Sequence, residues 1–142
     1  MKNHKAINVP ESMCEAYHYE KPSAFSRGAE TMIGDKKIVF VSGTASIGSD
    51  GKTKHKGDFV EQAKLMFSNV TDVLRNAGVT WDDVIKTTIY LRDIDRDYEL
   101  FNEVRSSFYD SIGVNPYPAS VCVEAKLCRS DLLLEMEATA IK

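Results

Sequence analysis

The sequence of 142 residues is 43% hydrophobic and 27% charged, which is typical of one globular domain and argues against a fibre, a coiled coil or a disordered chain. Its formal net charge of −3 and its pI near 5.6 offer no concentrated basic surface, so we expect no nucleic-acid partner. No run of about 20 apolar residues could form a membrane helix, and the first residues lack the apolar core of a secretory signal, so we expect a cytoplasmic protein.

The first element that the pattern predicts is a buried strand over 37–43, because this run is rich in β-branched residues and is bounded by glycines. A polar loop with a few lysines follows, and we expect it to be solvated. Asp58 is then expected to cap a helix that Gly78 ends. This helix is predicted from apolar residues that recur at steps of three and four, namely Phe59, Ala63, Met66, Val70, Val73 and Ala77.

A second strand and a second helix are predicted in the middle of the chain. Over 84–92 the apolar and polar residues alternate, so that every second residue from Ile85 to Leu91 should face the same side. Asp97 is expected to open the helix, which should end near Gly113.

Two strands, near 119–125 and 132–141, are predicted to close the chain. The order of strand, helix, strand, helix, strand, strand predicts a mixed sheet that carries both helices on one face. The other face keeps apolar groups that nothing in the chain covers, which favours self-association.

Four segments of the chain, taken together, resemble the YjgF/RidA family, also called the L-PSP endoribonuclease family. They are VFVSG at 39–43, EQAKLMFSNVTDVLRNAG at 61–78, VIKTTIYLRDIDRDYELFNEVRSSF at 84–108 and YPASVCVEAKLCRSDLLLEMEATA at 117–140. The resemblance covers roughly residues 22–142, which leaves 1–21 as an N-terminal segment that either contributes to a pocket wall or trails. It implies an α+β, chorismate-mutase-like fold that assembles into a homotrimeric barrel, with a small-molecule pocket at each subunit interface.

The same resemblance implies which residues line the pocket. Phe25 stands where the family often has a tyrosine, and the other implied positions are Ser42, Gly43, Asn102, Cys122 and Glu135. The chain departs from the family at Ser120, because imine-hydrolysing members carry there an arginine that binds the substrate carboxylate through two parallel hydrogen bonds. Lys126 and Arg129 are nearby in sequence, but neither occupies that position.

A second resemblance concerns the stretch from Cys128 to Glu135. It is similar to the closing segment of chorismatases and 3-hydroxybenzoate synthases, which are built from two domains of this fold. In some of those enzymes the matching cysteine and glutamate belong to the active site.

Each of these residues also has a plain structural interpretation. Glu135 would have a raised pKa in an apolar pocket and could then exchange protons, or it could be a solvated partner of Glu137. Cys122 and Cys128 could act as nucleophiles only if their pKa values were lowered, and otherwise they fill space. Arg129 could bind a ligand carboxylate, or it could pair with Asp131 on the surface.

The remaining candidates are polar or aromatic groups of ordinary kinds. The hydroxyls of Ser42 and Ser120 could donate hydrogen bonds to a ligand or bond locally. Asn102 could be a polar position on an amphipathic helix, and Phe25 could stack on a ligand or fill space. The three histidines have no spacing with cysteine, aspartate or glutamate that suggests a metal site, so we expect no metal.

Taken together, the residues and the resemblance predict a small-molecule pocket protein that acts on a carbonyl, imine/enamine or carboxylate metabolite. We expect a hydrolase or deaminase that needs no cofactor, in which Glu135 transfers protons. The alternatives are a non-catalytic metabolite-binding or chaperone-like trimer, and the endoribonuclease activity attributed to relatives.

Overall fold

A computed structural model describes residues 3–142 of the chain. One six-stranded sheet has the strand order β1-β2-β3-β6-β4-β5. Among the strand pairs of these residues, only β4 and β5 are parallel. The strands are β1 (Lys5–Ile7), β2 (Gly28–Ile33), β3 (Lys36–Thr44), β4 (Val84–Leu91), β5 (Ala119–Glu124) and β6 (Leu134–Ile141), and the helices are η1 (Ala16–His18), α1 (Phe59–Asn76), η2 (Trp81–Asp83) and α2 (Ile94–Ile112).

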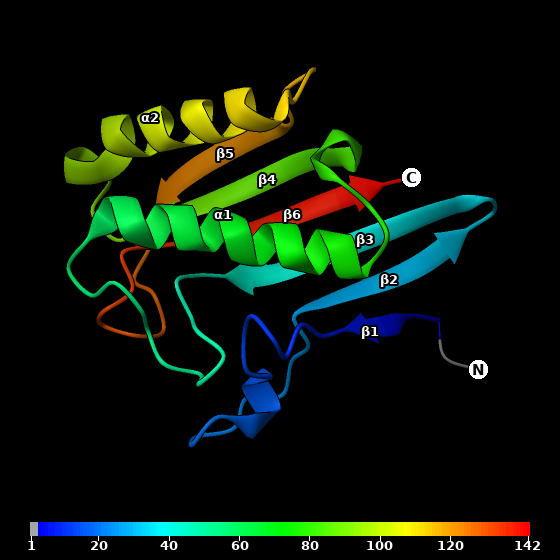
Figure 1. Ribbon diagram of the computed structural model, residues 1–142, viewed down its shortest axis with the longest axis horizontal. Coiled ribbons are helices and arrows are strands. Elements are labelled where there is room, and N and C mark those ends of the chain that lie inside the picture. The colour runs from blue at the N-terminus through cyan, green and yellow to red at the C-terminus, as the bar shows by residue number, and fades with distance from the viewer. Residues whose placement is uncertain (1–2) are drawn as a thin grey trace.

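The two long helices lie side by side on one face of the sheet, as Figure 1 shows. Between this layer and the sheet lies the core, in which Phe67 of α1, Phe101 of α2 and Met136 of β6 are almost completely buried. The mixed α+β architecture with both helices on one face is therefore confirmed.

The helix boundaries follow from their caps. The Asp58 carboxylate accepts a hydrogen bond from the Glu61 backbone N–H at 3.1 Å, so the predicted start of α1 is correct. The predicted start of α2 at Asp97 is wrong. The Asp93 carboxylate accepts from the Arg96 N–H at 3.0 Å and caps the helix a turn earlier, whereas Asp97 is buried inside it.

The strands alternate between the helix-covered face and an open face. In β6, Leu134 and Met136 are buried under the helices, while Glu135 and Glu137 project from the opposite side. The prediction that Ile85 faces the same side of β4 as Ile89 and Leu91 is wrong. The register shifts between Val84 and Lys86, so that Val84 enters the core and Ile85 is 50% exposed.

The open face carries several apolar side chains that no part of the described chain, residues 3–142, covers. Phe40 of β3 is 51% exposed there, and Val121 of the edge strand β5 is 45% exposed. Such a face is a surface suited to association.

The N-terminal region is built into the fold. β1 pairs with β2, and β2 extends the sheet beyond β3, although the sequence pattern predicted neither strand. Met13 and Ala16 are completely buried. Within residues 3–142, none of the helices is both long enough and apolar enough to cross a membrane.

Candidate functional site

The predicted catalytic residue, Glu135, lies on the open face of the sheet beside an irregularity in β3. The pairing of β3 with β6 shifts register between Val41 and Thr44, so Ser42 and Gly43 form a bulge. The Glu135 side chain folds over this bulge, and a methyl group on residue 43 would overlap its Oε1 atom and approach its Cδ atom to 3.0 Å. The absence of a side chain at Gly43 is therefore what gives the carboxyl its place.

The Glu135 carboxyl is only partly accessible to solvent, and this changes its acidity. Burial raises the pKa of Glu135 above its usual range, and the nearby Glu137 carboxylate adds to the shift. Glu137 accepts a hydrogen bond from the Tyr90 hydroxyl at 2.9 Å, and this contact raises the pKa of Tyr90. Glu135 is thus the carboxyl on this face that holds a proton at higher pH than usual.

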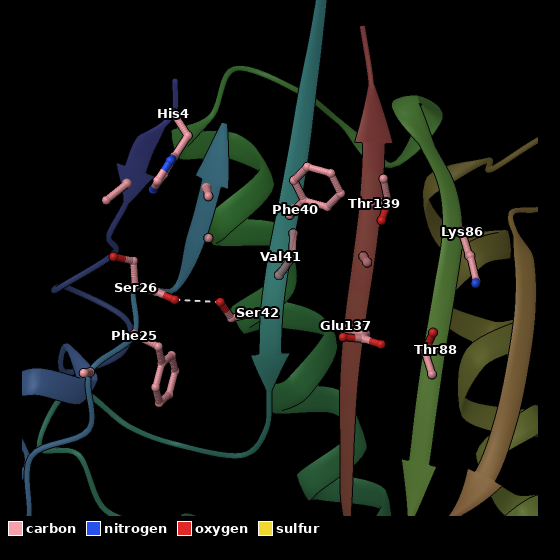
Figure 2. A pocket seen from close by; sticks show the side chains of 15 residues that line it. His4, Phe25, Ser26, Phe40, Val41, Ser42, Lys86, Thr88, Glu137 and Thr139 are labelled. Carbon is pink, nitrogen blue, oxygen red and sulfur yellow. Dashed lines mark hydrogen bonds between the residues drawn. The ribbon is translucent and has the colours of Figure 1, made fainter. Parts of the chain in front are cut away.

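A cavity of about 540 Å³ lies on the same face, and its lining includes Glu137 but not Glu135, which lies two residues away in β6. Figure 2 shows Phe25 and Ser42 at its wall, together with Phe40 and Glu137. The Ser42 hydroxyl cannot donate to a ligand in this arrangement, because it donates its proton to the Ser26 carbonyl oxygen at 2.6 Å. Of the predicted residues, the structure therefore brings Phe25, Ser42, Gly43 and Glu135 to one region of the open face.

The N-terminal segment contributes to this wall, since His4 and Ala6 line the cavity. Of the two roles left open for residues 1–21, the structure favours the pocket wall for residues 4 and 6; residues 1 and 2 lie outside the described chain.

A second group of predicted residues lies on the helix-covered side of the sheet, at its edge. Ser120 and Cys122 of β5 pair with the buried residues Thr87 and Ile89 of β4, so their side chains face α2. Asn102 projects from α2 toward the same place. Within one chain the structure therefore does not bring Ser120, Cys122 and Asn102 together with Glu135.

Arg105 joins this second group, and the sequence reasoning missed it. Its Nη1 donates to the Ser120 hydroxyl at 3.0 Å, and its Nη2 donates to the Asn102 side-chain carbonyl at 2.5 Å. Its guanidinium also lies 5.0 Å from the centre of the Phe101 ring. The signal available in the sequence was the spacing, because residues three and four apart share one helix face.

Cys122 does not have the lowered pKa that a nucleophilic thiol needs. Burial raises the pKa of the Cys122 thiol, and the Arg105 charge opposes this rise only in part. The space-filling interpretation of Cys122 is thus the better supported. All three cysteines are free, and Cys128 is exposed in the loop between β5 and β6.

Arg129 serves the packing of loops. Its Nη1 donates to the Gly51 carbonyl oxygen at 2.8 Å, and its guanidinium lies 4.8 Å from the centre of the Tyr19 ring. The suggested surface pair with Asp131 does not form, because Asp131 accepts from the Thr53 hydroxyl at 2.8 Å and pairs with Lys56 at 3.4 Å. Among residues 3–142 no group of three or more histidine, cysteine or acidic side chains is placed to hold a metal ion.

Comparison with known proteins gives a consistent result. A family model described as endoribonuclease L-PSP matches residues 20–142. A RutC family protein of Pyrococcus abyssi is 38% identical over 105 residues, which cover 74% of this chain and 79% of that protein. TdcF of Escherichia coli, whose name marks it provisionally as a reactive intermediate deaminase, is 34% identical over 85 residues, which cover 60% of this chain and 64% of TdcF. The crystal structure of TdcF with bound serine superimposes with a TM-score of 0.79 at 27% identity, covering 97% of this chain and 98% of that one.

Proposed function

We propose that this chain, which belongs to the endoribonuclease L-PSP family together with the YjgF/RidA and RutC proteins, is an enzyme that hydrolyses the imine or enamine form of a small carboxylate metabolite. The observation that carries the proposal is the Glu135 carboxyl, which is partly buried over Gly43 and has a raised pKa. A carboxyl with a pKa shifted toward neutrality can both donate and accept a proton under physiological conditions. The name of TdcF and the serine in its crystal structure support the same class of chemistry.

The reaction needs a proton donor and a proton acceptor, and one carboxyl can serve as both. As a water oxygen adds to the imine carbon, protonated Glu135 gives its proton to the imine nitrogen. The resulting carboxylate takes the proton that the added oxygen loses. The same carboxyl then protonates the amine nitrogen of this adduct, ammonia leaves, and the carboxylate regains a proton as the carbonyl forms. Imine and water are thus converted into carbonyl and ammonia, with Glu135 unchanged and no cofactor required.

We further propose that the site is completed by a second copy of the chain in a homotrimer. Glu135 and Arg105 lie on opposite faces of one sheet, so a single chain cannot offer both side chains to one small ligand. β5 is an edge strand with unpaired backbone groups, and the open face beside it is partly apolar. Association through these surfaces would place the edge of one copy against the Glu135 region of the next.

The test is hydrolysis of 2-iminopropionate, generated by an amino-acid oxidase and trapped with semicarbazide. Wild-type protein at catalytic concentration is expected to suppress the trapped product. Glu135→Gln should lose this suppression, whereas Glu103→Gln, which removes an exposed carboxylate from α2, should keep it. Failure of wild-type protein to suppress the product would contradict the proposal, and ligand that co-purifies without turnover would then favour the non-catalytic alternative. RNA cleavage that persists in Glu135→Gln would favour the ribonuclease alternative.

A further inference from the structure

We propose that Arg105 of α2 is the carboxylate-binding residue of this protein, in a subsite that it forms with Ser120 and Asn102. This inference rests on the proposed function, because it names the residue that holds the substrate's acid group.

The Arg105 guanidinium is held in position but not neutralised. Its hydrogen-bond partners are a hydroxyl and an amide oxygen, and it also contacts an aromatic ring. Within residues 3–142 it has no carboxylate within 4.0 Å. An arginine has five N–H donors in a planar fork, and two neutral contacts leave the remaining donors and the whole charge for a ligand.

Structural explanations that suit the other arginines do not suit Arg105. Of the five other arginines, two pair with aspartates. The remaining three donate to backbone carbonyl oxygens and so hold loops or the N-terminal segment in place. Within the described residues 3–142, Arg105 donates only to side chains and fixes no segment of backbone. The paired arginines are Arg75 and Arg96, and those that donate to backbone are Arg27, Arg92 and Arg129.

Two further hydroxyls lie close to one another on the Arg105 side of the sheet. The Thr87 hydroxyl is in the residue that pairs with Ser120 across the strands, and the Tyr109 hydroxyl is one helical turn from Arg105. Both residues are more than nine-tenths buried, and neither hydroxyl makes a hydrogen bond of normal geometry within residues 3–142. Buried hydroxyls usually have partners, so their position on the same side of the sheet as an unpaired cation marks a polar subsite.

The charge of Arg105 affects the pKa of Tyr109. Burial raises the pKa of Tyr109 to about 12, while the Arg105 charge and the Thr87 hydroxyl oppose the rise. Tyr109 therefore remains a neutral hydrogen-bond donor at physiological pH, which complements an anion. A single guanidinium balances the charge of one carboxylate. Its two parallel N–H donors also match the two oxygen acceptors of the carboxylate.

The small side chain at residue 120 is what makes this arrangement possible. Ser120 accepts the Nη1 hydrogen bond at 3.0 Å, so the guanidinium from α2 lies directly over the strand. The sequence comparison expected an arginine at residue 120 in imine-hydrolysing relatives. In this chain the positive charge beside residue 120 comes instead from Arg105 of α2.

Binding of pyruvate, measured by NMR titration of the wild-type protein, tests the proposal without requiring turnover. Pyruvamide has nearly the same shape without the charge and serves as the ligand control. Arg105→Gln should weaken pyruvate binding about 10- to 100-fold, as expected for loss of charge-assisted hydrogen bonds. Arg75→Gln removes the same charge from an exposed site on α1 and should leave the affinity unchanged.

Several outcomes would overturn this assignment. Unchanged pyruvate affinity in folded Arg105→Gln, equal affinity of the wild type for pyruvamide, or no pyruvate binding by the wild type would each do so. Arg105→Lys keeps the charge but loses the fork, and it should recover part of the affinity. If Glu135→Gln abolishes turnover while Arg105→Gln keeps both pyruvate affinity and KM, the proposed function stands and only the role of Arg105 fails.

Discussion

The side chain of Glu135 rests on the bare backbone of Gly43, so that no β-carbon could occupy residue 43 without displacing the carboxyl. The φ angle of Gly43 lies outside the left-handed region, so an alanine would not strain the backbone. A substitution at residue 43 therefore acts on the carboxyl and not on the fold.

Gly43→Ala is expected to lower kcat about 10²-fold, because a shift of about 1 Å in a catalytic group has an effect of this size. The free energy of unfolding should change by no more than about 1 kcal/mol. Gly48→Ala is the matched control, since a β-carbon there would also meet the flexible end of a charged side chain, that of Lys54. Equal activity of the two variants would show that the position of Glu135 does not matter.

The pH dependence of hydrolysis should follow Glu135. The step needs protonated Glu135, so kcat/KM is expected to fall as the pH rises through its raised pKa. Glu137→Gln removes a like charge, which lowers the pKa of Glu135 and should move this alkaline limb to lower pH. Rate profiles of both proteins across the same buffers provide the measurement. If the alkaline fall of kcat/KM in Glu137→Gln stays at the same pH or moves to higher pH, Glu135 is not the group that controls it.

The same carboxyl should make stability depend on pH. The folded protein binds the Glu135 proton more tightly than the unfolded chain does, so the stabilisation from this proton is complete below the unfolded pKa. It is lost as the pH rises through the folded pKa. Glu135→Gln should therefore unfold at higher urea concentration than wild type at pH 8, and the difference should disappear near pH 4. A variant less stable than wild type at pH 8 would refute this expectation.

The open sheet face should mediate assembly. Val121→Lys replaces an exposed apolar side chain of the edge strand with a charged one. The variant is expected to be monomeric, because burying an unpaired charge in an interface opposes association. Ile112→Lys changes a residue of similar exposure at the end of α2 and should leave the assembly intact. Light scattering of the purified proteins gives their masses. A Val121→Lys protein with the mass of the wild type would exclude this face from the interface.

Much of the fold could be predicted from local sequence patterns. The apolar stripe of α1 and the alternation in β4 each mark one buried face, and the β-branched run of β3 marks a buried strand, which is why these elements were found. β2 was missed because Met32 and Ile33, its apolar end, are both exposed. β1 has only three residues, and one of them is buried.

The site was harder to predict, since its residues meet only in three dimensions. Glu135 was found through the resemblance, and its pKa depends on burial that spacing does not reveal. Arg105 on α2 looks like any exposed charge of an amphipathic helix until β5 is packed beside it. Arg129, which the sequence suggested as the carboxylate contact, is instead engaged by a backbone carbonyl of a distant loop.

The catalytic role of Glu135 can be measured as the rate of 2-iminopropionate hydrolysis by Glu135→Ala, with and without added formate. We expect a rate about 10²- to 10⁴-fold below that of the wild type, the range typical for loss of a general acid and base. Formate, which replaces the missing carboxyl, should restore part of the rate, and formamide should not. Hydrolysis by Glu135→Ala at the wild-type rate would show that Glu135 is not the general acid and base.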